Sequence, residues 1–185
     1  MSYDFVLFKP RDGEDPVVTA QRDSQGFPST PPDPQKEALK RRVAGALINH
    51  DPKLAVFEFR YDQIAKLEKT SVEEARLKYR HLELNGPEDD GKGIQITLFD
   101  DEASVTVPFW HSGTKVEDVF REIWNYLKII AREADYVIYD RQIDRIIDPA
   151  TGFDESLACY SGVMSRMYDS PPPSFQEKKP WWKFW

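Results

Sequence analysis

The strongest constraint on this chain is the alternation of apolar and polar residues between positions 82 and 109. Polar residues separate the apolar ones in three short runs, which predicts strands because successive side chains of a strand point to opposite faces. The apolar members are Leu82 and Leu84, then Ile94, Ile96 and Leu98, then Val105, Val107 and Phe109. The links "NGPEDDGKG" and "DDEA" between the runs favour hairpins. We therefore expect an antiparallel sheet with one buried face.

The clearest predicted helix follows this sheet and extends to Ala134. Its apolar residues recur at steps of three and four from Val116 onward, so they form one stripe long enough to cover the sheet. Thr114 and Glu117 have the spacing of a capping box, which predicts the start of the helix. Glu117 and Arg121 can pair at i, i+4 on the exposed side.

Other segments complete an α+β pattern. The remaining expected elements are a strand at 3–8, a proline-broken loop at 9–34, a helix from Asp33-Pro34 to Asn49, a strand at 53–59, a short helix at 72–77 capped by Ser71 and Glu74, two strands around a turn at 140–142, and a last helix at 155–167. The pattern predicts one α+β domain, residues 1–168, whose mostly antiparallel sheet packs against two or more helices.

Residues 169–185 form a proline-rich spacer and an aromatic, basic tail that ends in "KKPWWKFW". Three of the five tryptophans lie in the last five positions, where their apolar area needs a surface to cover it. The tail could fold back onto the domain, dock on a partner protein, or contact a membrane surface, where Trp and Lys favour the headgroup region.

Charge and cysteine content narrow the class of partner. With 25 basic and 32 acidic residues the net charge is -7, which opposes binding to nucleic-acid phosphates and suits a basic protein partner. The single cysteine, Cys159, excludes an internal disulfide and favours a reducing, cytoplasmic compartment. No window approaches the roughly 20 apolar residues of a membrane-spanning helix.

No motif in the chain specifies a reaction, and we predict no catalytic, cofactor-binding or metal-binding residue. The three histidines are too far apart in sequence for a short metal motif, and the signatures of serine hydrolases, P-loop proteins and Rossmann enzymes are missing. His111, beside Trp110 at a strand end, is more typical of a surface or capping histidine than of a loop site, and His81 is expected to be exposed. Cys159 is more typical of a small core residue than of a nucleophile.

Two acidic clusters flank the strand at 94–99. At about 3.3 Å per residue the strand holds them roughly 20 Å apart, so they cannot form one site. Each is either a solvated turn or a patch that steers a basic partner. The candidate partner-binding residues are Glu88, Asp89, Asp90, Asp100, Asp101, Glu102, Trp110, His111, Trp181, Trp182, Phe184 and Trp185.

The segment "HLELNGPEDDGKGIQITLFDDEASVTVPFW", followed by a helix and "YVIYDRQIDRIID", resembles small bacterial proteins, some of which are similar to immunity proteins of contact-dependent or polymorphic toxin systems. The resemblance covers roughly residues 1–150, with Arg141 where a Tyr-Asp-Pro-Gln turn would have proline. It implies a cytoplasmic inhibitor of a cognate toxin, and it brings no catalytic residue or cofactor.

Three hypotheses follow from the sequence. The first is a non-enzymatic interaction protein, such as an immunity protein that binds a basic toxin domain. The second is a peripheral membrane protein anchored by its tail. The third is a small enzyme that uses His111 with nearby carboxylates. The sequence predicts no oligomeric state.

Overall fold

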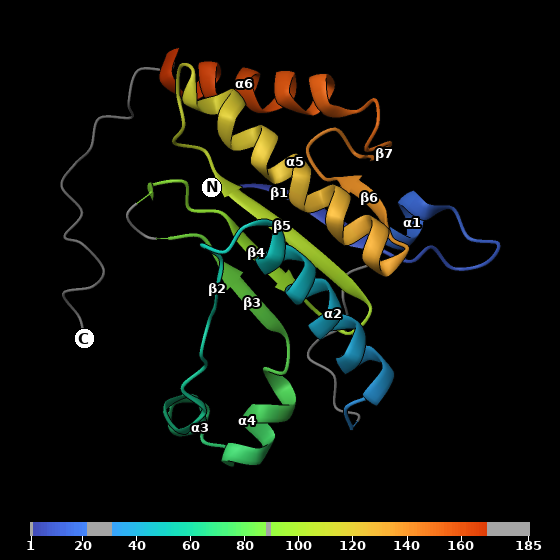
Figure 1. Ribbon diagram of the computed structural model, residues 1–185, viewed down its shortest axis with the longest axis vertical. Helices are drawn as coiled ribbons and strands as arrows, with labels where there is room; N and C mark the ends of the chain where they lie inside the picture. The colour runs from blue at the N-terminus through green and yellow to red at the C-terminus, as the bar shows by residue number, and fades with distance from the viewer. Residues whose placement is uncertain (1, 22–30, 88–89, 170–185) are drawn as a thin grey trace.

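The chain folds around one seven-stranded antiparallel sheet (Figure 1), and its computed structural model describes residues 2–21, 31–87 and 90–169. The strands are β1 (Ser2–Phe8), β2 (Ala55–Val56), β3 (Leu82–Asn85), β4 (Gln95–Leu98), β5 (Glu102–Pro108), β6 (Val137–Asp140) and β7 (Arg145–Ile147). The helices are α1 (Pro16–Gln21), α2 (Pro34–His50), α3 (Tyr61–Glu68), α4 (Val72–Lys78), α5 (Lys115–Ala134) and α6 (Phe153–Asp169). The strand order is β2-β3-β4-β5-β1-β6-β7, which confirms the predicted α+β fold.

One face of the sheet carries the main core. Tyr3, Phe5 and Leu7 of β1 are fully buried on this face, beneath α2 and α5. The predicted apolar residues of β3, β4 and β5 lie there as well, because each apolar position is paired with another across the ladder, as Leu84 is with Ile96. The helix α6 lies beside α5, on the side away from α2, and adds Tyr160 to the core (Figure 1).

The opposite face is partly covered by a helix that the sequence did not predict. α1 lies inside the segment expected to be a loop, and its Val17 and Ala20 pack on Val6, Phe8 and Tyr139 of the sheet. A helix of six residues offers too few turns for a periodic pattern, so the prolines of this segment dominated the prediction. Val6 and Phe8 of β1 are apolar and point to this face, and α1 shields them from solvent.

Of two other local predictions, one strand is shorter than expected and one helix cap is absent. The strand expected at 53–59 is only Ala55–Val56, and the chain turns into α3 soon afterwards. Thr114 makes no side-chain hydrogen bond to the start of α5, because its own backbone is already helical, with φ -66° and ψ -24°. The capping box at Ser71 and Glu74 and the Asp33 cap of α2 are confirmed.

A buried carboxylate joins the two ends of the domain. Asp140 is fully buried at the end of β6, and its Oδ2 accepts hydrogen bonds of 2.7 Å from both the Tyr3 hydroxyl and the Ser156 hydroxyl. Its Oδ1 accepts from the backbone N–H of Gln142 at 2.9 Å and of Ile143 at 3.4 Å, within the β6–β7 turn. All the strong lone-pair positions of this buried group are therefore used, as burial of a polar group requires. Asp140 thus connects β1, the β6–β7 turn and α6.

We predict that Tyr3→Phe lowers the free energy of unfolding by about 2 kcal/mol, because it removes a buried hydrogen bond to a carboxylate. Tyr136→Phe is the control: the Tyr136 side chain is partly buried, and its hydroxyl has no hydrogen-bond partner among the described residues. Urea unfolding of both variants measures the difference, and equal stabilities would contradict the role of Asp140.

Candidate functional site: the open face of the sheet

The uncovered part of the second sheet face is a polar surface that the fold builds from regular strands. Of the described helices, only α1 packs on this face, against the end of the sheet formed by β1, β6 and β7. The side chains that alternate with the core residues on β3, β4 and β5 are partly exposed, as is Asp4 of β1 beyond the part that α1 covers. We call this set the open face: Asp4, Glu83, Asn85, Gln95, Thr97, Glu102, Ser104 and Thr106.

The open face is acidic. It carries the carboxylates of Asp4, Glu83 and Glu102, and none of its strand positions holds a lysine or arginine. Glu83 accepts a hydrogen bond of 2.9 Å from the amide of Asn85, which fixes its position on β3. Burial raises the pKa of Glu102, while the positive charge of Arg141 opposes that shift. The negative potential of this face would attract a basic surface.

A row of aromatic rings borders the open face beside β2. The Phe57 and Phe59 rings meet edge to face with centroids 5.1 Å apart, and Phe59 meets His81 at 4.8 Å. His81 in turn lies 5.2 Å from the ring of Phe99. We call these four residues the aromatic row. Phe57 is 49% exposed, so the row presents apolar area to solvent next to the carboxylates.

His81 differs from its prediction, because it is half-buried in the aromatic row instead of exposed. Burial among the rings lowers the pKa of its imidazole, because burial disfavours the charged form; nearby Glu83 opposes this shift and Lys40 adds to it. The alternation of Phe57, Phe59 and Tyr61 was visible in the sequence. It could have indicated the row, but its closure by His81 and Phe99 needs the sheet.

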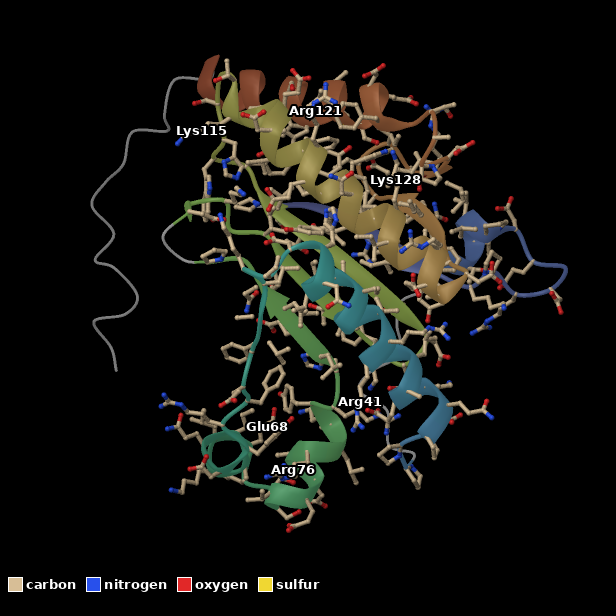
Figure 2. All side chains as sticks on the ribbon, viewed as in Figure 1. Arg41, Glu68, Arg76, Lys115, Arg121 and Lys128 are labelled. Carbon is tan, nitrogen blue, oxygen red and sulfur yellow. The ribbon has the colours of Figure 1, made fainter. Side chains whose placement is uncertain are left out.

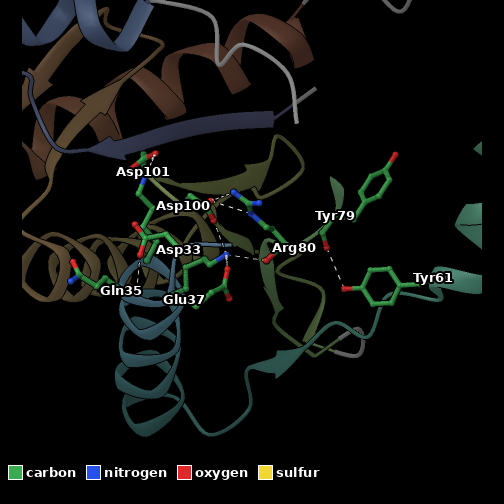
Figure 3. A network of polar contacts seen from close by, with 10 residues as sticks. Asp33, Gln35, Glu37, Tyr61, Tyr79, Arg80, Asp100 and Asp101 are labelled. Carbon is green, nitrogen blue, oxygen red and sulfur yellow. Dashed lines mark hydrogen bonds and ion pairs between the residues drawn. The ribbon is translucent and has the colours of Figure 1, made fainter. Parts of the chain in front are cut away.

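The acidic cluster at 100–102 is divided by the structure. Asp100 accepts hydrogen bonds from Lys40 at 2.9 Å and from Arg80 Nε at 3.1 Å, and Lys40 also lies 2.6 Å from Glu37 (Figure 3). The side chains of Lys40 and Arg80 are only 2% and 9% exposed. Burial opposes ionisation of Asp100, but the hydrogen bonds from the two cations outweigh it and lower its pKa. Asp100 is therefore an internal ion-pair partner and not a solvated turn residue.

Asp101 has a different environment from its neighbour. Its side chain is 77% exposed and pairs with Lys36 at 2.7 Å. It remains accessible to a partner, as does the open-face side of Glu102. Asp90 and Asp100 lie at opposite ends of β4, because Asp90 precedes this strand and Asp100 follows it.

Trp110 and His111 close the β3–β4 link instead of forming an open pocket. Trp110 donates a hydrogen bond of 3.0 Å from its indole N–H to the carbonyl of Gly91, and it remains 58% exposed. His111 is 5% exposed, and its Nε2 lies 2.8 Å from the Lys92 carbonyl. Lys92 is 3.6 Å from Asp90 and 2.5 Å from Glu122. The candidate residues Glu88, Asp89, Trp181, Trp182, Phe184 and Trp185 lie outside the described residues.

A helical hairpin extends the molecule beyond the sheet. The helices α3 and α4 pack on each other at one end of the domain (Figure 1), held by a Glu68–Lys78 pair and by Arg76 stacked over Tyr61. Figure 2 shows Glu68 and Arg76 on this hairpin, well separated from Arg121 and Lys128 on α5. Leu67 is 75% exposed there, so the hairpin offers further apolar area close to the aromatic row.

A shallow groove of about 230 Å³ lies along α5. Arg121, Asn125 and Lys128 line it on one helix face, and Phe153 forms its wall with the Arg121 guanidinium 5.2 Å above the ring. Arg121 already pairs with Glu117, as predicted. This groove carries the opposite charge to the open face and lies across α5 from the sheet.

Within residues 2–21, 31–87 and 90–169, no group of three or more His, Cys, Asp or Glu side chains is arranged to hold a metal ion. Cys159 is a free, partly buried thiol packed against the main core. Among the described helices, none combines the length and apolarity needed to cross a membrane. Comparisons with protein-family models, with curated proteins and with solved structures gave no match to this chain.

We predict that Asp100→Ala lowers the free energy of unfolding by about 3 kcal/mol, because it leaves two buried cations with reduced compensation. The adjacent Asp101→Ala is the control and should change stability by less than about 1 kcal/mol, as expected for an exposed pair. Chemical denaturation of the two variants measures both effects, and a small loss at Asp100 would show that Glu37 alone balances Lys40.

We also predict that His81 makes the fold less stable below neutral pH. Above about pH 6.5 the imidazole is neutral in both states, whereas below it the unfolded chain binds the proton more readily than the folded chain. The free energy of unfolding should therefore fall from about pH 7.5 to pH 5.5, across the ordinary histidine pKa. In His81→Phe this fall should be smaller, and an unchanged pH dependence would refute the assignment.

Proposed function

We propose that this chain is a non-enzymatic protein-interaction module that binds a basic protein partner through the open face. The proposal rests on the three carboxylates of the open face, which has no cation at its strand positions, and on the aromatic row at its border, whose Phe57 is exposed. The resemblance of the sequence to bacterial immunity proteins favours a toxin as that partner. Binding would then neutralise the toxin by covering its active site.

The two parts of this surface have different physical roles. Carboxylates spread over a flat face speed the encounter with a positive surface and reject acidic proteins. Aromatic rings contribute more of the affinity, because they bury large rigid areas at small entropic cost. Phe57 is the most exposed member of the aromatic row and is therefore its best anchor. The acidic face disfavours a nucleic acid, whose phosphates would be repelled.

An enzymatic use of His111 receives less support. Its ring nitrogen Nε2 meets a backbone carbonyl, and the ring is nearly inaccessible to a substrate. A general base needs to reach the proton that it removes, so this placement favours a structural role in the link between β3 and β4. The alternative of membrane contact through the tail rests on residues outside the described ones.

Purification of the intact chain from the cells that encode it should recover a stoichiometric basic protein. Thr97→Arg places a positive charge at the centre of the open face and should weaken that complex at least about tenfold, since like charges at an interface cost several kcal/mol. Asn125→Arg adds the same charge on the exposed side of α5 and is the matched control. Biolayer interferometry at low and high salt measures the affinities and association rates.

Two outcomes would reject the proposed function. One is the recovery of no stoichiometric protein under conditions that preserve weak complexes. The other is equal binding by Thr97→Arg and Asn125→Arg, which would move the interface away from the open face. Urea unfolding of each variant checks that a loss of binding is not a loss of fold. If the partner is a toxin, its activity should fall on addition of the native chain and less so on addition of Thr97→Arg.

A further inference from the structure

The outer edge of β2 has backbone groups that are available for pairing. β2 is the terminal strand of the sheet, and its described neighbour is β3 alone. The Phe57 N–H donates to the Glu83 carbonyl at 2.8 Å, so Phe57 and Ala55 turn their backbone groups toward β3. In an antiparallel strand the backbone N–H and C=O groups of successive residues point alternately to one side of the strand and to the other. The N–H and C=O of Val56 therefore point outward, and so would those of Glu58 if the chain stays extended.

This edge has only some of the features by which proteins usually block unwanted strand pairing. Natural edge strands are protected by short length, charges, proline, bulges or a covering element, and of these β2 has its two-residue length and the nearby charge of Glu58. Residues 55–58 are all exposed, with Val56 at 45% and Phe57 at 49%, and Glu58 is their only charge. Figure 1 shows no described element beside β2 on its outer side. The other edge, β7, differs because α1 lies against it and Arg145 pairs with Glu155.

We propose that a second copy of this chain pairs with β2 through this edge, in antiparallel orientation, with Phe57 opposite its own symmetry mate. A twofold pairing brings the same segment to both sides of one axis, so outward-facing residues must meet outward-facing residues. Three registers satisfy this condition, centred on Val56, Phe57 or Glu58. The described contacts distinguish among them.

Only the register centred on Phe57 agrees with all of these contacts. Pairing about Val56 would place Leu54 opposite Glu58, but Leu54 is buried and its N–H already donates to the Asp51 carbonyl at 3.1 Å. Pairing about Glu58 would set two carboxylates directly opposite each other, which is unfavourable. Pairing about Phe57 instead sets Val56 opposite Glu58, and no equal charges meet.

The same register joins the aromatic rows of the two copies. Phe57 would occupy a non-hydrogen-bonded position on the outer side, where Cα atoms approach to about 4.5 Å and side chains are closest. Ala55 would face Phe59 of the second copy, and its small side chain leaves space for that ring. The two Phe57–Phe59 pairs would then form one apolar strip across the axis, which explains why these rings are exposed in the single chain.

The contact between two edge strands is small, so we expect a dimer that forms and dissociates with concentration. Sedimentation velocity of the intact chain over a dilution series should show this exchange. Val56→Pro removes an outward N–H and leaves the N–H groups facing β3 in place, so it should yield a monomer at every concentration. Circular dichroism checks that this variant is folded.

Disulfide trapping tests the register separately. In a Cys159→Ser background, Phe57→Cys should form a covalent dimer under mild oxidation, since about 4.5 Å between Cα atoms permits a disulfide. Leu67→Cys, on the 75% exposed Leu67 of α3, is the control for random collision and should cross-link much more slowly. Equal cross-linking rates would overturn the register.

If the native chain stays monomeric at its highest soluble concentration, the proposal that a second copy pairs with β2 is wrong. If in that case Val56→Pro also loses binding to the basic partner, the edge accepts a strand of that partner instead. If Thr97→Arg abolishes partner binding while the dimer persists, the two surfaces act independently. The dimer proposal can thus fail without the proposed function failing, and the reverse also holds.

Discussion

The rest of the structure depends on the buried carboxylate of Asp140. A charge without access to water is tolerated only when hydrogen bonds replace its hydration, and here the donors come from three separate parts of the chain. Tyr3 donates a hydrogen bond from β1, Ser156 donates one from α6, and the backbone N–H of Gln142 donates one from the β6–β7 turn. None of these parts can move away without leaving the carboxylate unsatisfied. The group therefore fixes where α6 lies on α5 and where β1 enters the sheet.

The two faces of the sheet are under different constraints. The core face is filled by α2, α5 and α6, and any change there disturbs close packing. No described helix packs on the open face over β3, β4 and β5, so its side chains are constrained by the pleat and by contacts with one another, such as the hydrogen bond from Asn85 to Glu83. Substitution of a partly exposed side chain such as Glu83 should therefore disturb the fold less than substitution in the core. On the other side of the sheet, hydrogen bonds from Lys40 of α2 to Asp100 and to the Arg80 carbonyl connect the β4–β5 turn to α2.

The sequence was informative where a local pattern determines structure, and less so where distant residues meet. The alternation from Leu82 to Phe109 predicted three strands, and the apolar stripe of α5 predicted the covering helix. In both patterns the spacing of the apolar residues alone shows which face of the element is buried. Asp100 looked like a solvated turn residue because its partner Lys40 is 60 positions away. His81 looked exposed for the same reason, since the rings around it come from both sides in sequence. Open-face residues such as Thr97 appeared only as the polar half of an alternation, and only the sheet unites them.

The position of β1 has a consequence for how the chain acquires its structure. This first strand lies between β5 and β6, so the residues that flank it in the sheet are 102–108 and 137–140. During synthesis β1 cannot pair with β5 and β6 until most of the domain has left the ribosome, so no N-terminal part can complete a core of its own. Such long-range pairing favours slow assembly of the sheet. Until β1 is paired, the apolar run "YDFVLF" stays uncovered, and exposed apolar segments of this kind promote aggregation of incompletely folded chains.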